Sequence, residues 1–189
     1  ASAYAKTVDR NFEATVPEGC DTQTDIANQL IEAMESGLID VAMGGGRRNF
    51  VDASMEIEEG TTGRREDGRN LIEEAEADRG DEPSLAEMTA KAIETLQASG
   101  GENGFFLQVE SGRVDHANHA GNAGRMVRDG RAFVEAIRVA DEMTDDANTL
   151  IVVTADHEHA IGLNGYCGRG SNILGLCAEI NNEGVETTG

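Results

Sequence analysis

Apolar positions at helical spacing mark four segments of the chain. Side chains three or four residues apart predict helices with one buried face. The predicted helices cover residues 25–36, 70–78, 85 to about 100, and 117–143. Thr24 is the expected N-cap of the first helix, and Gly37 is its expected C-terminal glycine. Ser84 and Glu87 have the spacing of a capping box at the start of the third.

Short continuous apolar runs separate these helices. They occupy residues 38–43, 105–109 and 150–153, and each is predicted to form a strand. Residues 51–68 are polar and rich in glycine and are predicted to form a loop. Continuous apolar strands that alternate with helices are typical of a parallel sheet covered by helices. The pattern therefore predicts an α/β fold, with residues 1–189 forming a single α/β domain.

The charge of the chain limits its partners. The 189 residues carry 15 basic and 36 acidic side chains, a formal net charge of −21, and the isoelectric point is about 4.3. So negative a protein lacks the basic face that nucleic acids or anionic membranes require. No apolar run approaches the roughly 18 residues of a membrane span.

Lysine is scarce, since only Lys6 and Lys91 are present and the other basic residues are arginine. Many carboxylates with few lysines and few large apolar side chains indicate adaptation to high salt. The alternative is an ordinary acidic protein whose charge serves solubility.

Three cysteines are present in the chain. A disulfide between Cys167 and Cys177 would leave Cys20 free or paired elsewhere. The chain has no CxxC motif, so the cysteines do not resemble the ligands of a zinc site.

All four histidines follow the predicted strands at 105–109 and 150–153. Asp115 and His119 are four residues apart, a spacing that puts a carboxylate and an imidazole on one helix face. Asp156 and His157 follow the second strand directly, and Glu110 ends the first. Ligands bind outside the carboxyl ends of strands in open α/β sheets. Nitrogen and oxygen donors together suit zinc, and Glu110 suits magnesium. Carboxylate–histidine hydrogen bonds at helix starts are the structural alternative.

Two motifs carry a specific resemblance. Residues 109–119 read Val-Glu-x-Gly-Arg-x-Asp-His-x-x-His, and residues 153–159 read Val-Thr-Ala-Asp-His-x-His. Together they resemble two signatures of the alkaline phosphatases. The segments 4–11, 25–47, 83–88 and 168–173 are also similar to that family, so the resemblance covers most of the chain. It implies an α/β/α sandwich with a parallel sheet, of which this chain would be the middle part.

The resemblance implies a role for each matched residue. Asp115 and His119 would bind a first zinc ion, Asp156 and His157 a second, and Glu110 one magnesium ion. Arg10 would hold two phosphate oxygens, a bidentate contact that lysine cannot make. His159 would orient a ligand carboxylate such as Asp115 from the second shell. His116 occupies a variable position beside the site.

The same resemblance implies the activity. Two zinc ions and one magnesium ion would serve the hydrolysis of phosphomonoesters, with inorganic phosphate as a product that also binds. It further implies a periplasmic or extracellular location and admits a homodimer. In the family, the serine nucleophile and a bridging aspartate precede Arg10, and a third zinc-binding histidine follows Gly189. A segment is also skipped between Gly80 and Asp81. Low activity is therefore expected of this chain.

Two other functions remain open at this stage. The chain could be a metal- or phosphate-binding fragment without catalysis, because no serine nucleophile is matched. It could also be a related phosphomutase, which Glu110 and His159 disfavour. The glycines at 44–46, followed by Arg47, could hold a phosphate but lack the ending of a P-loop.

The charge pattern predicts that salt stabilises the protein. The screening length falls from about 30 Å at 0.01 M to about 3 Å at 1 M, which removes most repulsion among carboxylates in the folded state. The melting temperature should rise between about 0.05 M and about 2 M NaCl, and KCl at matched ionic strength should act alike. A flat or falling melting temperature would leave only the solubility interpretation.

Overall fold

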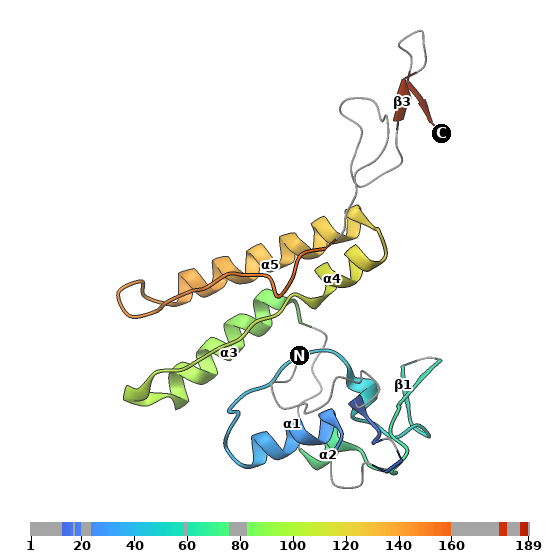
Figure 1. The fold of residues 1–189 in the computed structure, drawn as a ribbon. Helices are drawn as coiled ribbons and strands as arrows, with labels where there is room; N and C mark the ends of the chain where they lie inside the picture. The colour runs from blue at the N-terminus through green and yellow to red at the C-terminus, as the bar shows by residue number, and fades with distance from the viewer. Residues whose placement is uncertain are drawn as a thin grey trace. The chain divides into compact units, whose positions relative to one another are not determined.

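The computed structural model describes residues 13–16, 18–19, 24–58, 60–75, 83–159, 178–180 and 186–188. Arg10, the three cysteines and the segment 168–173 lie outside these residues. The chain divides into two compact units, Ala1–Asp81 and Glu82–Gly189. Each unit is described by itself, and Figure 1 gives the labels of the helices and strands.

The first unit is built around a small apolar cluster. Its helices are α1 (Ile26–Glu35) and α2 (Leu71–Glu74), with a 3-10 turn η2 (Arg47–Asn49) between them. Ala27 and Ile31 of α1 pack with Leu71 of α2, and Phe50 covers them. The predicted helices at 25–36 and 70–78 are confirmed in position, although α2 is shorter than the pattern indicates. Gly37 ends α1 with φ of +71°, a conformation that favours glycine.

The predicted loop at 51–68 holds more structure than its polar sequence indicates. It contains a hairpin of β1 (Glu56–Glu58) and β2 (Thr61–Thr62), which pair antiparallel. Gly63 passes against the backbone of Val51, where a side-chain carbon would lie 2.1 Å from the Val51 carbonyl oxygen. A residue with a side chain at position 63 would collide with the Val51 carbonyl, so only glycine lets the chain after β2 pass this close to Val51.

Arg65 is the buried centre of the first unit, with 1% of its side chain exposed. Its guanidinium donates to both carboxylate oxygens of Asp25, at 2.8 and 3.0 Å. It also binds the carboxylate of Asp67 through two nitrogens. Asp25 in turn accepts from the backbone N–H of Asn28 at 3.0 Å and so caps α1. The N-cap predicted at Thr24 is therefore wrong by one residue, because the carboxylate of Asp25 holds both the helix end and the arginine.

The electrostatics of Arg65 follow from this pairing. Burial by itself would lower the pKa of Arg65, but the hydrogen bonds to Asp25 and Asp67 outweigh it and raise the pKa. The bond from Arg65 lowers the pKa of the Asp67 carboxyl in turn. A planar guanidinium can hold two carboxylates in this way, whereas lysine cannot.

Three helices form the body of the second unit. They are α3 (Leu85–Ser99), α4 (Gly112–His119) and α5 (Ala123–Met143), and α5 packs against both of the others. The capping box is confirmed, since Ser84 and Glu87 bond to each other's backbone N–H groups. Gln97 of α3 donates to the carbonyl of Met143 at 3.1 Å, which ties the two C-terminal ends together.

The single helix predicted over 117–143 is in fact two helices. The chain turns at Gly121, whose φ is +61°. Asn122 then caps α5 by accepting from the backbone N–H of Arg125 at 2.9 Å. A left-handed glycine followed by a capping amide ends one helix and starts the next, a signal that the apolar spacing hides.

None of the three predicted strands is assigned as a strand among the described residues, and the first has bends at Leu38 and Asp40. Figure 1 shows the segment after α3 running back along α3, and the segment after α5 running back along α5, so that both run the same way. The strand pairs within the described residues are antiparallel, namely β1 with β2 and β3 (Ala178–Ile180) with β4 (Glu186–Thr188). The parallel sheet and the sandwich stay predictions.

Most side chains of the three apolar runs are exposed in the described residues. Phe106 is 87% exposed and Leu150 is 86% exposed, whereas Leu107 and Val109 are partly buried. Ile151, Val152 and Val153 are exposed as well, so a covering layer over these runs is absent from the described residues. No helix among the described residues is long and apolar enough to cross a membrane.

The Arg65 pairing predicts a large stability effect. Arg65→Leu should lower the free energy of unfolding by about 3–5 kcal/mol, because it strands two carboxylates, one of them buried. Arg64→Ala is the matched control, since that side chain is half exposed and only 3.6 Å from Glu13. It should cost less than about 1 kcal/mol. Urea unfolding measures both, and equal effects would contradict the role of Arg65.

Candidate metal centre

The first half of the candidate centre comes from α4. Asp115 lies in the first turn of this helix and His119 in its last. The spacing of four brings them to one face, as predicted, with 3.6 Å between Asp115 Oδ2 and His119 Nε2. The α-helix thus holds a carboxylate and an imidazole side by side without any long-range contact.

The second half comes from the segment that returns along α5. His157 and His159 are two residues apart, and the chain bends at Asp156 and His157. Their Nε2 atoms lie 3.7 and 3.8 Å from Asp115 Oδ1. The chain between Asp115 and these histidines contains all of α5, so the tertiary fold brings the two predicted clusters together.

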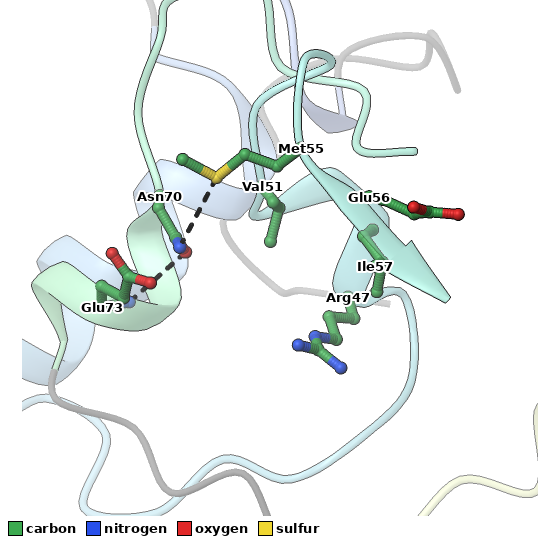
Figure 2. A pocket seen from close by; sticks show the side chains of 7 residues that line it. All are labelled: Arg47, Val51, Met55, Glu56, Ile57, Asn70 and Glu73. Atoms are coloured by element: carbon green, nitrogen blue, oxygen red, sulfur yellow. Dashed lines mark hydrogen bonds between the residues drawn. The ribbon is translucent and has the colours of Figure 1, made fainter. Parts of the chain in front are cut away.

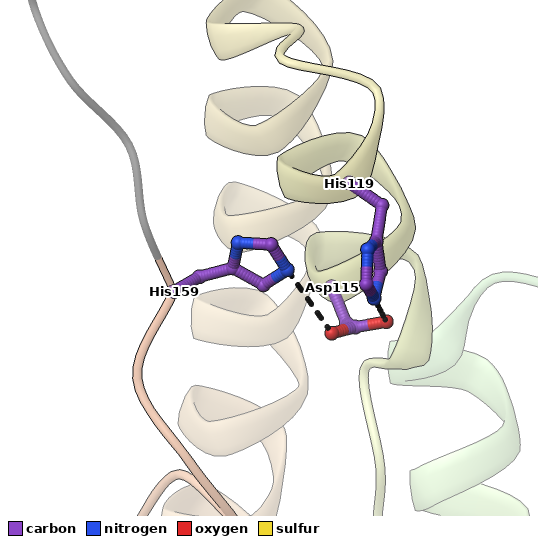
Figure 3. Close-up of side chains that lie close together, drawn as sticks. All are labelled: Asp115, His119 and His159. Atoms are coloured by element: carbon purple, nitrogen blue, oxygen red, sulfur yellow. Dashed lines mark ion pairs between the residues drawn. The ribbon is translucent and has the colours of Figure 1, made fainter.

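Asp115 is the centre of the arrangement. Figure 3 shows its two carboxylate oxygens facing different imidazoles, those of His119 and His159. These two rings meet edge to face, with centroids 4.5 Å apart and an angle of 87° between their planes. One donor atom each from Asp115, His119 and His159 lie within 4.8 Å of one another. They are the one such group of three among the residues that the structure describes.

The donor set fits a metal ion. Asp115 Oδ1 is shielded from solvent and has no hydrogen-bond partner within the described part of the chain. Both imidazole nitrogens near it lie beyond hydrogen-bond distance. Ligands at about 2.0–2.2 Å from a tetrahedral ion lie roughly 3.3–3.5 Å apart, close to these separations. A cation would satisfy the unpaired oxygen, and nitrogen and oxygen donors suit zinc.

His157 is prepared to bind through one nitrogen. Its Nδ1 lies 2.8 Å from the carbonyl oxygen of Glu158, which can only accept. Nδ1 therefore carries the proton, and the neutral ring keeps its lone pair on Nε2, which faces Asp115 and Asp156. The bond to Glu158 and the charges of Asp156 and Asp115 raise the pKa of His157.

Other predicted site residues lie outside the group of three. The side chain of Asp156 is 85% exposed and lies 3.5 Å from His157 Nε2. Glu110 precedes α4, with its Oε1 over Gly112. His116 lies 3.5 Å from Arg113. His159, predicted to orient Asp115, lies 3.8 Å from Asp115 Oδ1 and is part of the group of three. Its role stays a prediction.

The first unit also contains a cavity among its described residues. It has a volume of about 320 Å³ and is lined by Arg47, Val51, Met55, Glu56, Ile57, Asn70 and Glu73, which Figure 2 shows. Asn70 caps α2 by accepting from the backbone N–H of Glu73 at 3.4 Å.

Asp115, His119 and His159 form a group of donors that could hold a metal ion, and it lies beyond two segments of the kind that end at ligand sites in α/β proteins. The sequence model of the alkaline phosphatases matches residues 1–81 and 74–188. The chain belongs to the alkaline phosphatase family. The two matched pieces meet at 74–81, the region where the sequence resemblance has the chain skip a segment.

Individual relatives agree with this assignment. The chain is 35% identical to the membrane-bound alkaline phosphatase of Bombyx mori, with 96% of this chain and 42% of the relative covered. It is 33% identical to an alkaline phosphatase of Gadus morhua, with 96% and 48% covered. Identity to the human tissue-nonspecific isozyme is 30%, with 96% and 44% covered. The chain thus spans less than half the length of these relatives.

The geometry predicts that Asp115 is needed for metal binding. Asp115→Asn keeps the shape of the side chain but removes its charge. The dissociation constant for Zn²⁺ should rise more than about 100-fold, because loss of partners outside the coordination sphere already costs 10–100-fold. Calorimetric titration measures it, with Asp141→Asn on the exposed side of α5 as control. Unchanged affinity in Asp115→Asn would remove the cluster from consideration.

Proposed function

We propose that this chain is part of a metal-dependent hydrolase of phosphomonoesters. The observation that carries the proposal is the meeting of Asp115 with His119, His157 and His159 in a chain of the alkaline phosphatase family. Phosphomonoester hydrolysis needs a centre that neutralises the charge of the phosphoryl group, and bound cations provide this.

The proposed metal ligands follow the two clusters. Asp115 and His119 bind a first zinc ion, which their separation of 3.6 Å supports. Asp156 and His157 bind a second, which their separation of 3.5 Å supports. Zinc, when bound, polarises phosphoryl oxygens and lowers the pKa of a bound water.

The remaining residues hold the ligands and the substrate. Glu110, at the end of its extended segment, is the proposed magnesium ligand, since magnesium prefers oxygen donors. Arg10 binds two oxygens of the phosphoryl group through its planar guanidinium. The Glu158 carbonyl fixes the tautomer of His157, so that Nε2 is free to bind. His116 lies beside the site on α4 and is near Arg113.

Broader properties of the protein belong to the same proposal. The match of the family model to both units supports one α/β domain over residues 1–189, with the sandwich fold of the family. The parallel course of the two extended segments supports its sheet. A periplasmic or extracellular location is part of the same proposal and follows from membership of the family. A homodimer and adaptation to high salt complete the proposal.

The expected rate of this chain is low. In the family, the serine nucleophile precedes the segment that Arg10 matches. We therefore expect the zinc-loaded 189-residue chain to hydrolyse 4-nitrophenyl phosphate far more slowly than a complete relative, because loss of an activated nucleophile leaves only binding and electrostatics. Zinc-dependent binding of inorganic phosphate is the activity that should remain.

The test of this function is phosphate binding to the zinc-loaded chain, measured by calorimetry. Arg10→Ala should weaken inorganic phosphate about 10–100-fold, since a hydrogen bond to a charged group contributes about 1.5–3 kcal/mol. Arg48→Ala, beside the glycine turn, should bind as the unchanged chain does. If Arg48→Ala fails and Arg10→Ala does not, phosphate binds at the glycine turn. Absence of zinc-dependent phosphate binding would contradict the proposed function.

A further inference from the structure

The cavity of the first unit combines apolar side chains with a few polar groups. Val51, Met55 and Ile57 supply an aliphatic surface, and the lining residues include no aromatic ring. Asn70 and Arg47 supply N–H donors. The volume of about 320 Å³ is within the range of sites for small molecules, which are typically apolar with a few convergent polar groups.

Backbone hydrogen bonds hold the walls of this cavity in place. Asn70 forms an antiparallel bridge with Val51, so the start of α2 is fixed to the segment opposite it. Met55 donates its backbone N–H to the carbonyl of Asp52 at 3.0 Å and accepts from the N–H of Gly63 at 3.1 Å. The cavity is therefore formed before a ligand arrives, which lowers the entropic cost of binding.

Asn70 provides a buried donor at the cavity, because this residue is only 9% exposed. Its Oδ1 is occupied by the backbone N–H of Glu73. Its Nδ2 donates toward the sulfur of Met55 at 3.9 Å, as Figure 2 shows. A thioether is a weak acceptor, and an amide nitrogen carries two N–H groups. A carboxylate oxygen in the cavity would satisfy this amide better than the sulfur does.

Arg47 is a cation at the cavity without a carboxylate partner in the described part of the chain. Its guanidinium forms no ion pair there, although the sequence has 36 acidic side chains. Figure 2 shows this guanidinium facing the cavity. An arginine with no acidic partner beside an aliphatic surface favours a ligand that carries an anionic group.

Two carboxylates also line the cavity, and each has another partner. Oε1 of Glu56 accepts from the backbone N–H of Gly60 at 3.1 Å, in the turn between β1 and β2. Figure 2 shows the Glu56 carboxylate on the far side from Asn70. Glu73 likewise has an interaction of its own. Arg47 is therefore the lining charge that a ligand can neutralise.

We propose that this cavity binds a small aliphatic carboxylate. The carboxylate binds Arg47, with the Asn70 amide as a further donor, and the aliphatic chain packs on the apolar side chains. A guanidinium binds a carboxylate through two parallel hydrogen bonds. The flexible side chain of Met55 can adapt to chains of different shape. The site shares no residue with the candidate metal centre, so the inference is independent of the proposed function.

The experiment titrates the 189-residue chain with acetate, butanoate, hexanoate and octanoate, followed by NMR chemical shifts. Affinity should rise about fourfold for each CH₂ group that the cavity buries. Arg47→Gln should weaken hexanoate binding about 10–100-fold, because it removes a charged hydrogen-bond donor. Arg48→Gln is the matched control, since Arg48 does not line the cavity. It should bind hexanoate as the unchanged chain does.

A second variant and a second ligand test the cavity itself. Ile57→Trp fills the apolar part without changing its charge, so it should remove the dependence of affinity on chain length. Hexylammonium should bind more weakly than hexanoate, because Arg47 repels it. Circular dichroism checks that each variant keeps its helices. The titrations are made with a chelator and again with zinc, and the results should agree.

Four outcomes would overturn the inference. Equal weakening in Arg47→Gln and Arg48→Gln would mean that hexanoate responds only to the net charge. Affinity that does not change from acetate to octanoate would mean that the cavity buries no chain. Tighter binding of hexylammonium would assign the site to its two carboxylates. Binding that requires zinc would place the ligand at the metal centre. Each of these outcomes leaves the phosphate-binding test of the proposed function unaffected.

Discussion

The candidate metal centre depends on the length of helix α5 being matched by the length of the segment that returns along it in the second unit. Helix α5 has 21 residues and therefore spans about 31 Å. The chain then reverses, and an extended segment covers the same distance in about ten residues, at roughly 3.3 Å each. The returning segment brings residues 157–159 back to the region where α4 leads into α5, and Asp115 lies on α4. A shorter helix or a coiled return would leave the histidines far from the carboxylate.

Once the returning segment has placed the histidines near α4, the local backbone geometry sets how each imidazole faces Asp115. The helical spacing of four aligns His119 with Asp115, and after a bend at Asp156 and His157 both His157 and His159 approach the same carboxylate. One carboxylate therefore meets imidazoles from two separate parts of the chain. The result is a concentrated set of donors around one negative charge, which is the requirement for holding a divalent cation.

The first unit is organised by a charged residue rather than by apolar burial alone. Its apolar cluster is small, and Arg65 joins the start of α1 to the loop before α2 through Asp25 and Asp67. Such a network favours one arrangement of the chain, because each buried charge must find its partner. The many carboxylates of this acidic chain supply those partners, and its preference for arginine over lysine supplies the bidentate donor.

The sequence by itself indicated α1, α3 and most of α5, and it indicated the residue types of the centre, but it missed α4 as a separate helix and the early end of α2. Residues three or four apart lie next to each other on a helix. The capping box at Ser84 uses the spacing of three, and the pair of Asp115 and His119 uses the spacing of four. The break at Gly121 was also encoded locally, but the apolar spacing on either side concealed it. Apolar runs indicated extended segments, yet burial on both faces depends on neighbours that a run of residues does not specify.

Only the tertiary structure decided which distant residues meet. Nothing in the spacing of Arg65 and Asp25 relates them, and a polar stretch looks like a loop whether or not an arginine folds inward. The approach of His159 to Asp115 likewise depends on the length of α5 and on where the chain turns back. Contacts between residues close in sequence follow from the fixed geometry of helix and strand. Contacts between distant residues follow from packing, because only packing sets the path of the chain between them.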